Sequence, residues 1–269
     1  MKKILILTIA FVAFLGVQYA KAWHNFAHGT IAYIAEQHLT PEAKAKCHHY
    51  LRHTLPSYAS WMDSWKGAEK FIFVNKSHGG RAMDDNVNYD FKSGEPEGGV
   101  MGYLVLALEE LGNGKYKSLP DSVVRQRIIN MVHYVPDMHC PSHVNLPESV
   151  YPIQREHKLF DNGKKLSYHR YWDHSLGMQG RKNWNYEKIA AQIDVCTQRE
   201  IKAIQSGTLE DWGRDIVKLA NRSRRITPVG IDVAHMSYEQ KDDAMKLAND
   251  AAQMGAYRLA HVLNTIFSE

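Results

Sequence analysis

Cysteine is scarce in this sequence, which excludes a fold held together by disulfide bonds. The thiols among the 269 residues are those of Cys47, Cys140 and Cys196. An odd number allows at most one internal disulfide, whereas small secreted scaffolds depend on several. Stability must therefore come from a hydrophobic core, and a hydrophobic content of 44% is sufficient to form one.

An excess of one charge sign is also missing. The 33 basic and 29 acidic residues leave a formal net charge of +4. Lys2, Lys3 and Lys21 lie in the first 22 residues, which contain no acid, so the formal charge of the remaining chain falls by three, to +1. This balance does not provide the strongly basic surface that is typical of nucleic-acid-binding proteins. If the protein acts on phosphodiesters, bound cations must supply much of the positive potential.

Long hydrophobic runs are absent except near the first residue. Two lysines precede an apolar stretch at 4–17, and the small-x-small sequence AKA follows at 20–22. This order predicts a secretory signal peptide over residues 1–22, and its apolar stretch is too short for a comfortable membrane span. We therefore expect a secreted or periplasmic protein that begins at Trp23 after cleavage and has no stable membrane association.

Apolar residues recur with helical spacing through most of the remaining chain. Helices are expected near 28–35, from 41 onward, and over 57–66, 98–111, 121–143, 184–205, 209–221 and 237–267. A short extended stretch is expected at 71–74, and the Asp-Asn-Gly sequence at 161–163 predicts a β-hairpin turn. Without repeats or linkers, the sequence indicates one mainly α domain, residues 23–269, with a small hairpin excursion.

One histidine-rich stretch, HYVPDMHCPSH at 133–143, stands out chemically. His133 and Asp137 are four residues apart, and the same spacing recurs at His169 and Asp173. On a helix, residues four apart share a face. Zinc binds imidazole nitrogen and carboxylate oxygen at similar distances, so each pair could hold one ion. A helix that is merely rich in histidine is the alternative for any single pair.

Three further residues are candidate ligands. Cleavage would free the α-amino group of Trp23, which has an ordinary pKa of ~7.7–8.0 and can lose its proton to bind a metal; His28 follows five residues later. Asp63 lies between aromatic residues, where a buried carboxylate is usually paired or metal-bound. Taken singly, each has an ordinary explanation: an apolar terminus, a surface histidine and an exposed acid on an amphipathic helix.

Together these features resemble the S1/P1 nuclease family of zinc-dependent nucleases and 3′-nucleotidases. The matching stretches are WHNFAH at 23–28, ASWMD at 59–63, HYVPDMHCPSH at 133–143 and SYHRYWD at 167–173. The resemblance extends to QMGAYRLAHVLN at 253–264. It implies a single-domain helical fold of the phospholipase C and S1/P1 nuclease type.

The resemblance also implies three zinc ions in one cleft. The first would be bound by Asp63, His133, Asp137 and a further histidine. The second would be bound by His143, His169 and Asp173. The third would be bound by the amino and carbonyl groups of Trp23, by His28 and by a bridging Asp137. His139 matches no family ligand, so we expect a structural role for it.

Several positions depart from the family pattern. The family's remaining histidine ligand corresponds to Ile72, and His78 in the following loop could replace it. Pro136 stands where the family has glycine, Ser167 where it has asparagine, and Cys140 where it has glutamine. These departures indicate a divergent member.

The activity that the resemblance implies is hydrolysis of single-stranded DNA or RNA to 5′-phosphate products, together with 3′-nucleotidase activity on 3′-nucleotides. Asp63 would orient the attacking water, and Lys66, where the family often has arginine, would stabilise the phosphate together with zinc. Phe73 would stack on a base. We expect a monomer. Two alternatives stay open: a zinc-dependent phospholipase C, and a secreted zinc-binding protein without catalytic activity.

Overall fold

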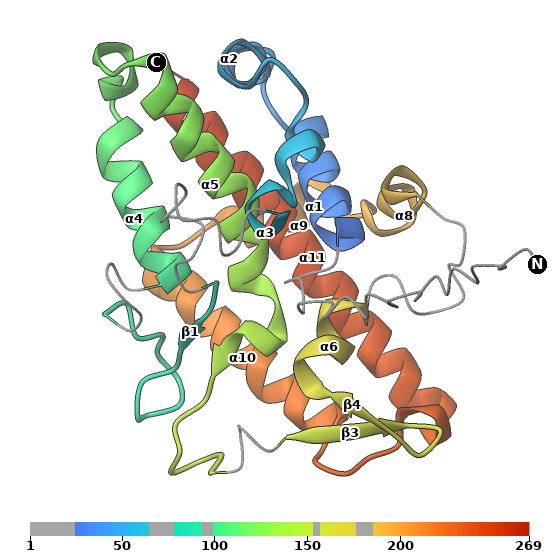
Figure 1. Cartoon of the computed structure of the whole chain (residues 1–269). Coiled ribbons are helices and arrows are strands. Elements are labelled where there is room, and N and C mark those ends of the chain that lie inside the picture. Colours follow the sequence, from blue (N-terminus) through green and yellow to red (C-terminus); the bar gives the residue numbers. More distant parts are fainter. Residues whose placement is uncertain (1–24, 65–77, 93–98, 153–156, 176–184, 269) are drawn as a thin grey trace, which may run out of the picture.

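The computed structural model describes residues 25–64, 78–92, 99–152, 157–175 and 185–268, and within them the fold is mainly α, as the sequence predicts (Figure 1). The α-helices are α1 (Asn25–Gln37), α2 (Pro41–Leu51), α3 (Trp61–Ser64), α4 (Gly99–Leu111), α5 (Asp121–His139), α6 (Tyr168–Asp173), α8 (Tyr186–Ile193), α9 (Gln198–Gln205), α10 (Leu209–Ile226) and α11 (Tyr238–Phe267). The short 3-10 helices are η1 (Leu55–Tyr58), η3 (Lys115–Ser118), η4 (Pro141–His143) and η6 (Val233–His235).

Strands are few and short in the described part of the chain. β1 (Gly80–Arg81) pairs in parallel with β2 (Val144–Asn145), and β3 (Lys158–Asp161) pairs antiparallel with β4 (Lys164–Ser167). The first pair joins the loop that follows His78 to the chain just after η4. It therefore brings two histidine-bearing segments together although they are far apart in sequence.

The central element is α11, which packs against α1, α5, α9 and α10. Its inner face carries alanines at 248, 252 and 256 that are fully buried or nearly so, and small side chains let neighbouring helices approach closely. One apolar cluster lies around α5, α4 and α2, and a second lies around α1, α8 and the middle of α11. Figure 1 shows α5 running along the upper part of α11, with α1 on the other side of it. Among the described residues, no helix is long and apolar enough to cross a membrane.

Helix starts follow the local sequence. The Thr40 side chain accepts a hydrogen bond from the Ala43 backbone N–H, and Pro41 occupies the first turn of α2. Ser237 and Gln240 form a capping box at the start of α11. Side-chain oxygens satisfy backbone N–H groups that lack partners inside the helix. Both predicted starts are confirmed.

The predicted hairpin is confirmed, and its turn is Asn162–Gly163. Both residues have positive φ angles, 49° and 74°, as a two-residue type I′ turn requires. The Asp232 carboxylate accepts hydrogen bonds from both backbone N–H groups. The hairpin leads directly into α6, which carries His169 and Asp173.

Gly163→Ala should therefore lower the free energy of unfolding by about 1 kcal/mol, because a Cβ atom is unfavourable in the left-handed region. Nothing lies within 4 Å of that Cβ position, so no steric clash contributes. Gly163→Asn should cost less, because asparagine tolerates this conformation. Chemical denaturation at a fixed zinc concentration measures both; equal losses would show that backbone conformation is not the cause.

Three long helical segments in the sequence prediction are wrong in detail. The segment 121–143 divides into α5, which ends at His139, and η4. The segment 57–66 divides into η1 and α3 where it is described, and 184–205 divides into α8 and α9. Asp194 follows the last residue of α8, and its carboxylate contacts His38, just after α1, at 2.9 Å and accepts a 2.7 Å hydrogen bond from Tyr257 on α11. Thr197 then starts α9 with its own capping box. The predicted extended stretch at 71–74 lies outside the described residues.

The contacts of Asp194 predict a pH dependence of stability. Burial acts to raise its pKa, but the hydrogen bonds from His38 and Tyr257 lower it below the ordinary value. A lowered pKa stabilises the fold above the unfolded value of ~3.9, and this contribution disappears as pH falls toward the folded-state pKa. Asp194→Asn should cost about 1 kcal/mol at neutral pH, and the difference from wild type should shrink below pH ~3.9. Denaturation of both metal-free proteins across pH tests this; a constant difference would contradict it.

Candidate metal centre

The candidate ligands within the described residues come from separate elements and meet in one place. Helix α5 carries His133 and Asp137 on one face and continues past Pro136 to His139. The other contributors are His28 on α1, Asp63 on α3, His78 before β1, His143 in η4, and His169 and Asp173 on α6. Trp23, Lys66, Ile72 and Phe73 lie outside the described residues.

Asp137 lies at the centre of a first group, the Asp137 cluster, made of His28, Asp63, His78, His133 and Asp137. The Oδ1 atom of Asp137 lies 3.2 Å from His28 Nε2 and 3.3 Å from His143 Nδ1. Its Oδ2 lies 3.0 Å from His78 Nδ1 and 3.2 Å from His133 Nε2. The side chain is fully buried, yet neither oxygen accepts a hydrogen bond of normal geometry from the described residues. A carboxylate bridging two ions would face the imidazoles in this way.

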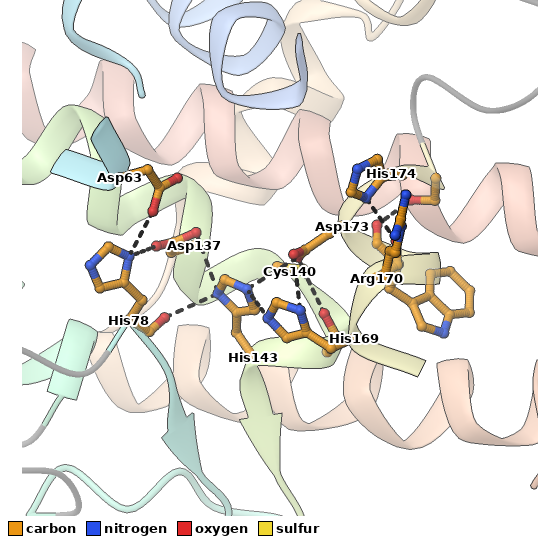
Figure 2. Close-up of polar contacts among 12 residues, drawn as sticks. Asp63, His78, Asp137, Cys140, His143, His169, Arg170, Asp173 and His174 are labelled. Atoms are coloured by element: carbon orange, nitrogen blue, oxygen red, sulfur yellow. Dashed lines mark hydrogen bonds and ion pairs between the residues drawn. The ribbon is translucent and has the colours of Figure 1, made fainter. Parts of the chain in front are cut away.

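Asp63 and His78 complete one side of this cluster, as Figure 2 shows. His78 Nδ1 lies 2.9 Å from His133 Nε2 and 3.7 Å from Asp63 Oδ1. His133 Nδ1 donates to the Ala59 carbonyl at 2.7 Å, which turns Nε2 and its lone pair toward the cluster. Ring orientation by a backbone carbonyl is typical of metal-binding histidines. The structure therefore brings His78 together with Asp63, His133 and Asp137.

A second group, the Asp173 cluster, consists of Cys140, His143, His169 and Asp173. His143 Nε2 lies 3.2 Å from Asp173 Oδ1 and 3.1 Å from His169 Nε2. His169 Nδ1 lies 3.1 Å from Asp173 Oδ2. The His78 carbonyl lies 3.0 Å from His143 Nδ1 and accepts from it, so the two clusters share a structural link. Figure 2 shows these side chains next to Asp137.

Cys140 is the residue of this group that the sequence reasoning did not assign to a site. Its sulfur lies 3.4 Å from Asp173 Oδ1 and 3.1 Å from Ser142 Oγ. The side chain is fully buried, and burial raises the pKa of the thiol to about 11. A signal existed in the sequence: Cys140 and His143 are separated by two residues, close enough along the chain for both side chains to reach one ion.

Charge in the centre is balanced by imidazoles. Burial acts to raise the pKa of Asp137, but His133 and His143 outweigh it and hold that pKa well below its ordinary value. Burial also acts to raise the pKa of Asp173, but the hydrogen bond and charge of His143 lower that pKa below its ordinary value. Burial, together with His133, lowers the pKa of His28. The carboxylates therefore stay ionised at neutral pH, and neutral imidazole, the form that binds metal, is favoured at His28.

The donor set fits zinc. At bond lengths of ~2.0–2.1 Å, ligand atoms around a tetrahedral ion are separated by roughly 3.3 Å. The separations around Asp137 of 3.0–3.3 Å and around Asp173 of 3.1–3.2 Å are close to this value. Fully buried carboxylate oxygens without hydrogen bonds of normal geometry also need a cation. Nitrogen, oxygen and sulfur donors together favour zinc over magnesium or calcium.

His139 faces away from both clusters into the packing between helices. Its Nδ1 donates to the Val135 carbonyl at 2.8 Å, and its Nε2 lies 3.1 Å from Arg258 Nη1. Burial and Arg258 lower its pKa to about 3, so the ring is neutral and accepts from the guanidinium. Arg258 also binds Asp215 at 2.7 Å. The contacts of His139 are thus those of a structural residue, in line with the sequence prediction.

Comparison with known proteins agrees with this geometry. A family model described as S1/P1 Nuclease matches residues 23–268. Nuclease S1 of Aspergillus oryzae is 23% identical over 296 residues, and the match covers 100% of this chain and 99% of that protein. The chain therefore belongs to the S1/P1 nuclease family and, as a member of it, is a hydrolase that acts on phosphodiester bonds and binds zinc.

Proposed function

We propose that this protein is a secreted, zinc-dependent nuclease that hydrolyses single-stranded DNA or RNA to 5′-phosphate products and also removes the phosphate of 3′-nucleotides. The observation that carries the proposal is the convergence of imidazoles from several elements on the buried Asp137 carboxylate. The family match begins at residue 23, the position at which the sequence predicts the mature chain to start. This supports cleavage after Ala22.

We assign the zinc ligands in three sets. The first is Asp63, His78, His133 and Asp137; the second is His143, His169 and Asp173; the third is Trp23, His28 and Asp137. When bound, zinc lowers the pKa of a water molecule and withdraws charge from phosphate oxygens. The chain carries little net charge of its own, so bound cations would also supply the potential that attracts a polyanion.

The chain's own side chains position the reactants. Asp63 lies at the edge of the Asp137 cluster, 3.7 Å and 3.8 Å from the nitrogens of His78 and His133. From there its carboxylate would hold the attacking water in line with the phosphorus atom. Lys66, three residues further on, would place a positive charge on the phosphate. Phe73 would stack on a base of any identity, which suits single strands and disfavours intact duplex.

An N-terminal extension should disturb one ion selectively. The free amine of Trp23 would be a ligand only after cleavage. His28, five residues later in the sequence, has its Nε2 atom 3.2 Å from Asp137 Oδ1. Protein produced with one extra alanine before Trp23 should therefore bind one zinc ion fewer per chain than protein beginning at Trp23. Metal analysis after gel filtration measures the difference. Equal zinc content in both proteins would contradict this role for Trp23.

The direct test compares substrates. Protein beginning at Trp23 and loaded with zinc should hydrolyse single-stranded DNA faster than duplex DNA, leave 5′-phosphate ends, and release phosphate from a 3′-nucleotide. Turnover of phosphatidylcholine in its place would support the phospholipase alternative. Full zinc loading without turnover of either substrate would support the inactive zinc-binding alternative. Gel filtration of the same protein tests the expected monomer.

A further inference from the structure

Cys140 differs from the other thiols of the chain in its surroundings. Cys47 is buried in the apolar cluster around α5, and Cys196 is partly exposed beyond the end of α8. The Cys140 sulfur instead faces a carboxylate, with Asp173 Oδ1 at 3.4 Å. The thiol donates a weak hydrogen bond to this carboxylate, which holds its sulfur beside an oxygen that can bind metal.

The geometry around Asp173 has room for a sulfur ligand. A tetrahedral ion with bond lengths of ~2.0–2.1 Å to nitrogen or oxygen and ~2.3 Å to sulfur separates sulfur from those atoms by roughly 3.5 Å. The distance of 3.4 Å from Cys140 Sγ to Asp173 Oδ1 is close to this value. The ligand atoms of Cys140, His143 and Asp173 all lie within 4.8 Å of one another.

A second observation, independent of the cysteine, points to a ligand at the same place. Asp173 is 1% exposed, and its Oδ2 accepts no hydrogen bond of normal geometry from the described residues. His169 Nδ1 lies 3.1 Å from this oxygen. A carboxylate of this kind needs a cation close by.

We propose that Cys140 is a fourth ligand of the ion bound by His143, His169 and Asp173. This inference rests on the proposed zinc centre and extends it, because it gives that ion a sulfur donor. Binding as thiolate releases the thiol proton to solvent. Four protein ligands would complete the tetrahedral shell, as in structural zinc sites, whereas catalytic sites keep one position open. The ion of the Asp173 cluster would then hold α6 to η4, and the ions around Asp137 would perform the hydrolysis.

Cobalt substitution tests the assignment with a readout other than activity. Protein beginning at Trp23 is stripped of metal and titrated with Co²⁺. We expect a near-ultraviolet band from sulfur-to-cobalt charge transfer, which nitrogen and oxygen ligands do not produce. The band should be lost in Cys140→Ser and kept in the matched control Cys196→Ser. The zinc affinity of one site should fall at least ~10-fold in Cys140→Ser. Loss of a residue that only hydrogen-bonds to a metal ligand already weakens binding by about this factor.

Each outcome has a defined meaning. Cobalt uptake without the sulfur band, or a band that persists in Cys140→Ser, overturns this proposal and leaves the nitrogen and oxygen centre intact. Failure of wild type to bind cobalt overturns the zinc centre as well. Hydrolysis of single-stranded DNA by the zinc protein is measured separately, so loss of the proposed nuclease activity is not confused with loss of the sulfur ligand. Cys140→Ala serves in the same experiment if Cys140→Ser does not fold, as judged by circular dichroism.

Discussion

Asp137→Asn should reduce hydrolysis of single-stranded DNA about 1,000-fold or more and release zinc from the protein. The carboxylate faces the imidazoles of His28, His78, His133 and His143 at 3.0–3.3 Å. An amide of the same size keeps the volume but removes the negative charge and one of the two acceptor atoms that a bridging ligand provides. Metal catalysis is worth several kcal/mol in the transition state, and each ~1.36 kcal/mol changes the rate tenfold.

The experiment measures turnover and zinc content of the same preparations. Asp84→Asn is a suitable control, because Asp84 is an exposed carboxylate in the loop after β1 and the substitution makes the same change of charge. The control should keep both activity and zinc. Asp137→Asn protein that retains full turnover on single-stranded DNA would remove Asp137 from the proposed mechanism.

Much of this site is predictable because its ligands recur at helical spacing. His133 and Asp137 share a face of α5, and His169 and Asp173 share a face of α6, since residues four apart on a helix must do so. The helix starts at Thr40 and Ser237 and the Asn162–Gly163 turn are equally local. In each of these places the interaction that decides the structure lies within a few residues of the chain.

The rest depends on contacts between segments distant in sequence. The position of His78 at Asp137 depends on the pairing of β1 with β2, about 65 residues away. The break between α8 and α9 depends on contacts of Asp194 with His38, which follows α1, and with Tyr257 on α11. The spacing of apolar residues along the sequence does not indicate which distant segments will come into contact. The role of Cys140 is only partly predictable from the sequence. Its spacing from His143 is local, whereas its contact with Asp173 depends on the fold.

Removing zinc should lower the thermal midpoint of unfolding by about 10 °C. The candidate ligands join α1, α3, α5, η4 and α6, so bound ions would connect segments that otherwise meet through packing alone. An ion that binds the folded state and not the unfolded chain stabilises by about 4 kcal/mol when its concentration is ~1,000 times the dissociation constant. For a protein of this size, each kcal/mol shifts the midpoint by about 2–4 °C.

Differential scanning calorimetry with and without a chelator measures this shift, and the Asp137→Asn protein separates its cause. If the ions act through the Asp137 cluster, the variant should unfold near the midpoint of metal-free wild type and respond little to added zinc. The Asp84→Asn control should keep the full response. A midpoint that is the same with and without zinc would show that these side chains do not share an ion.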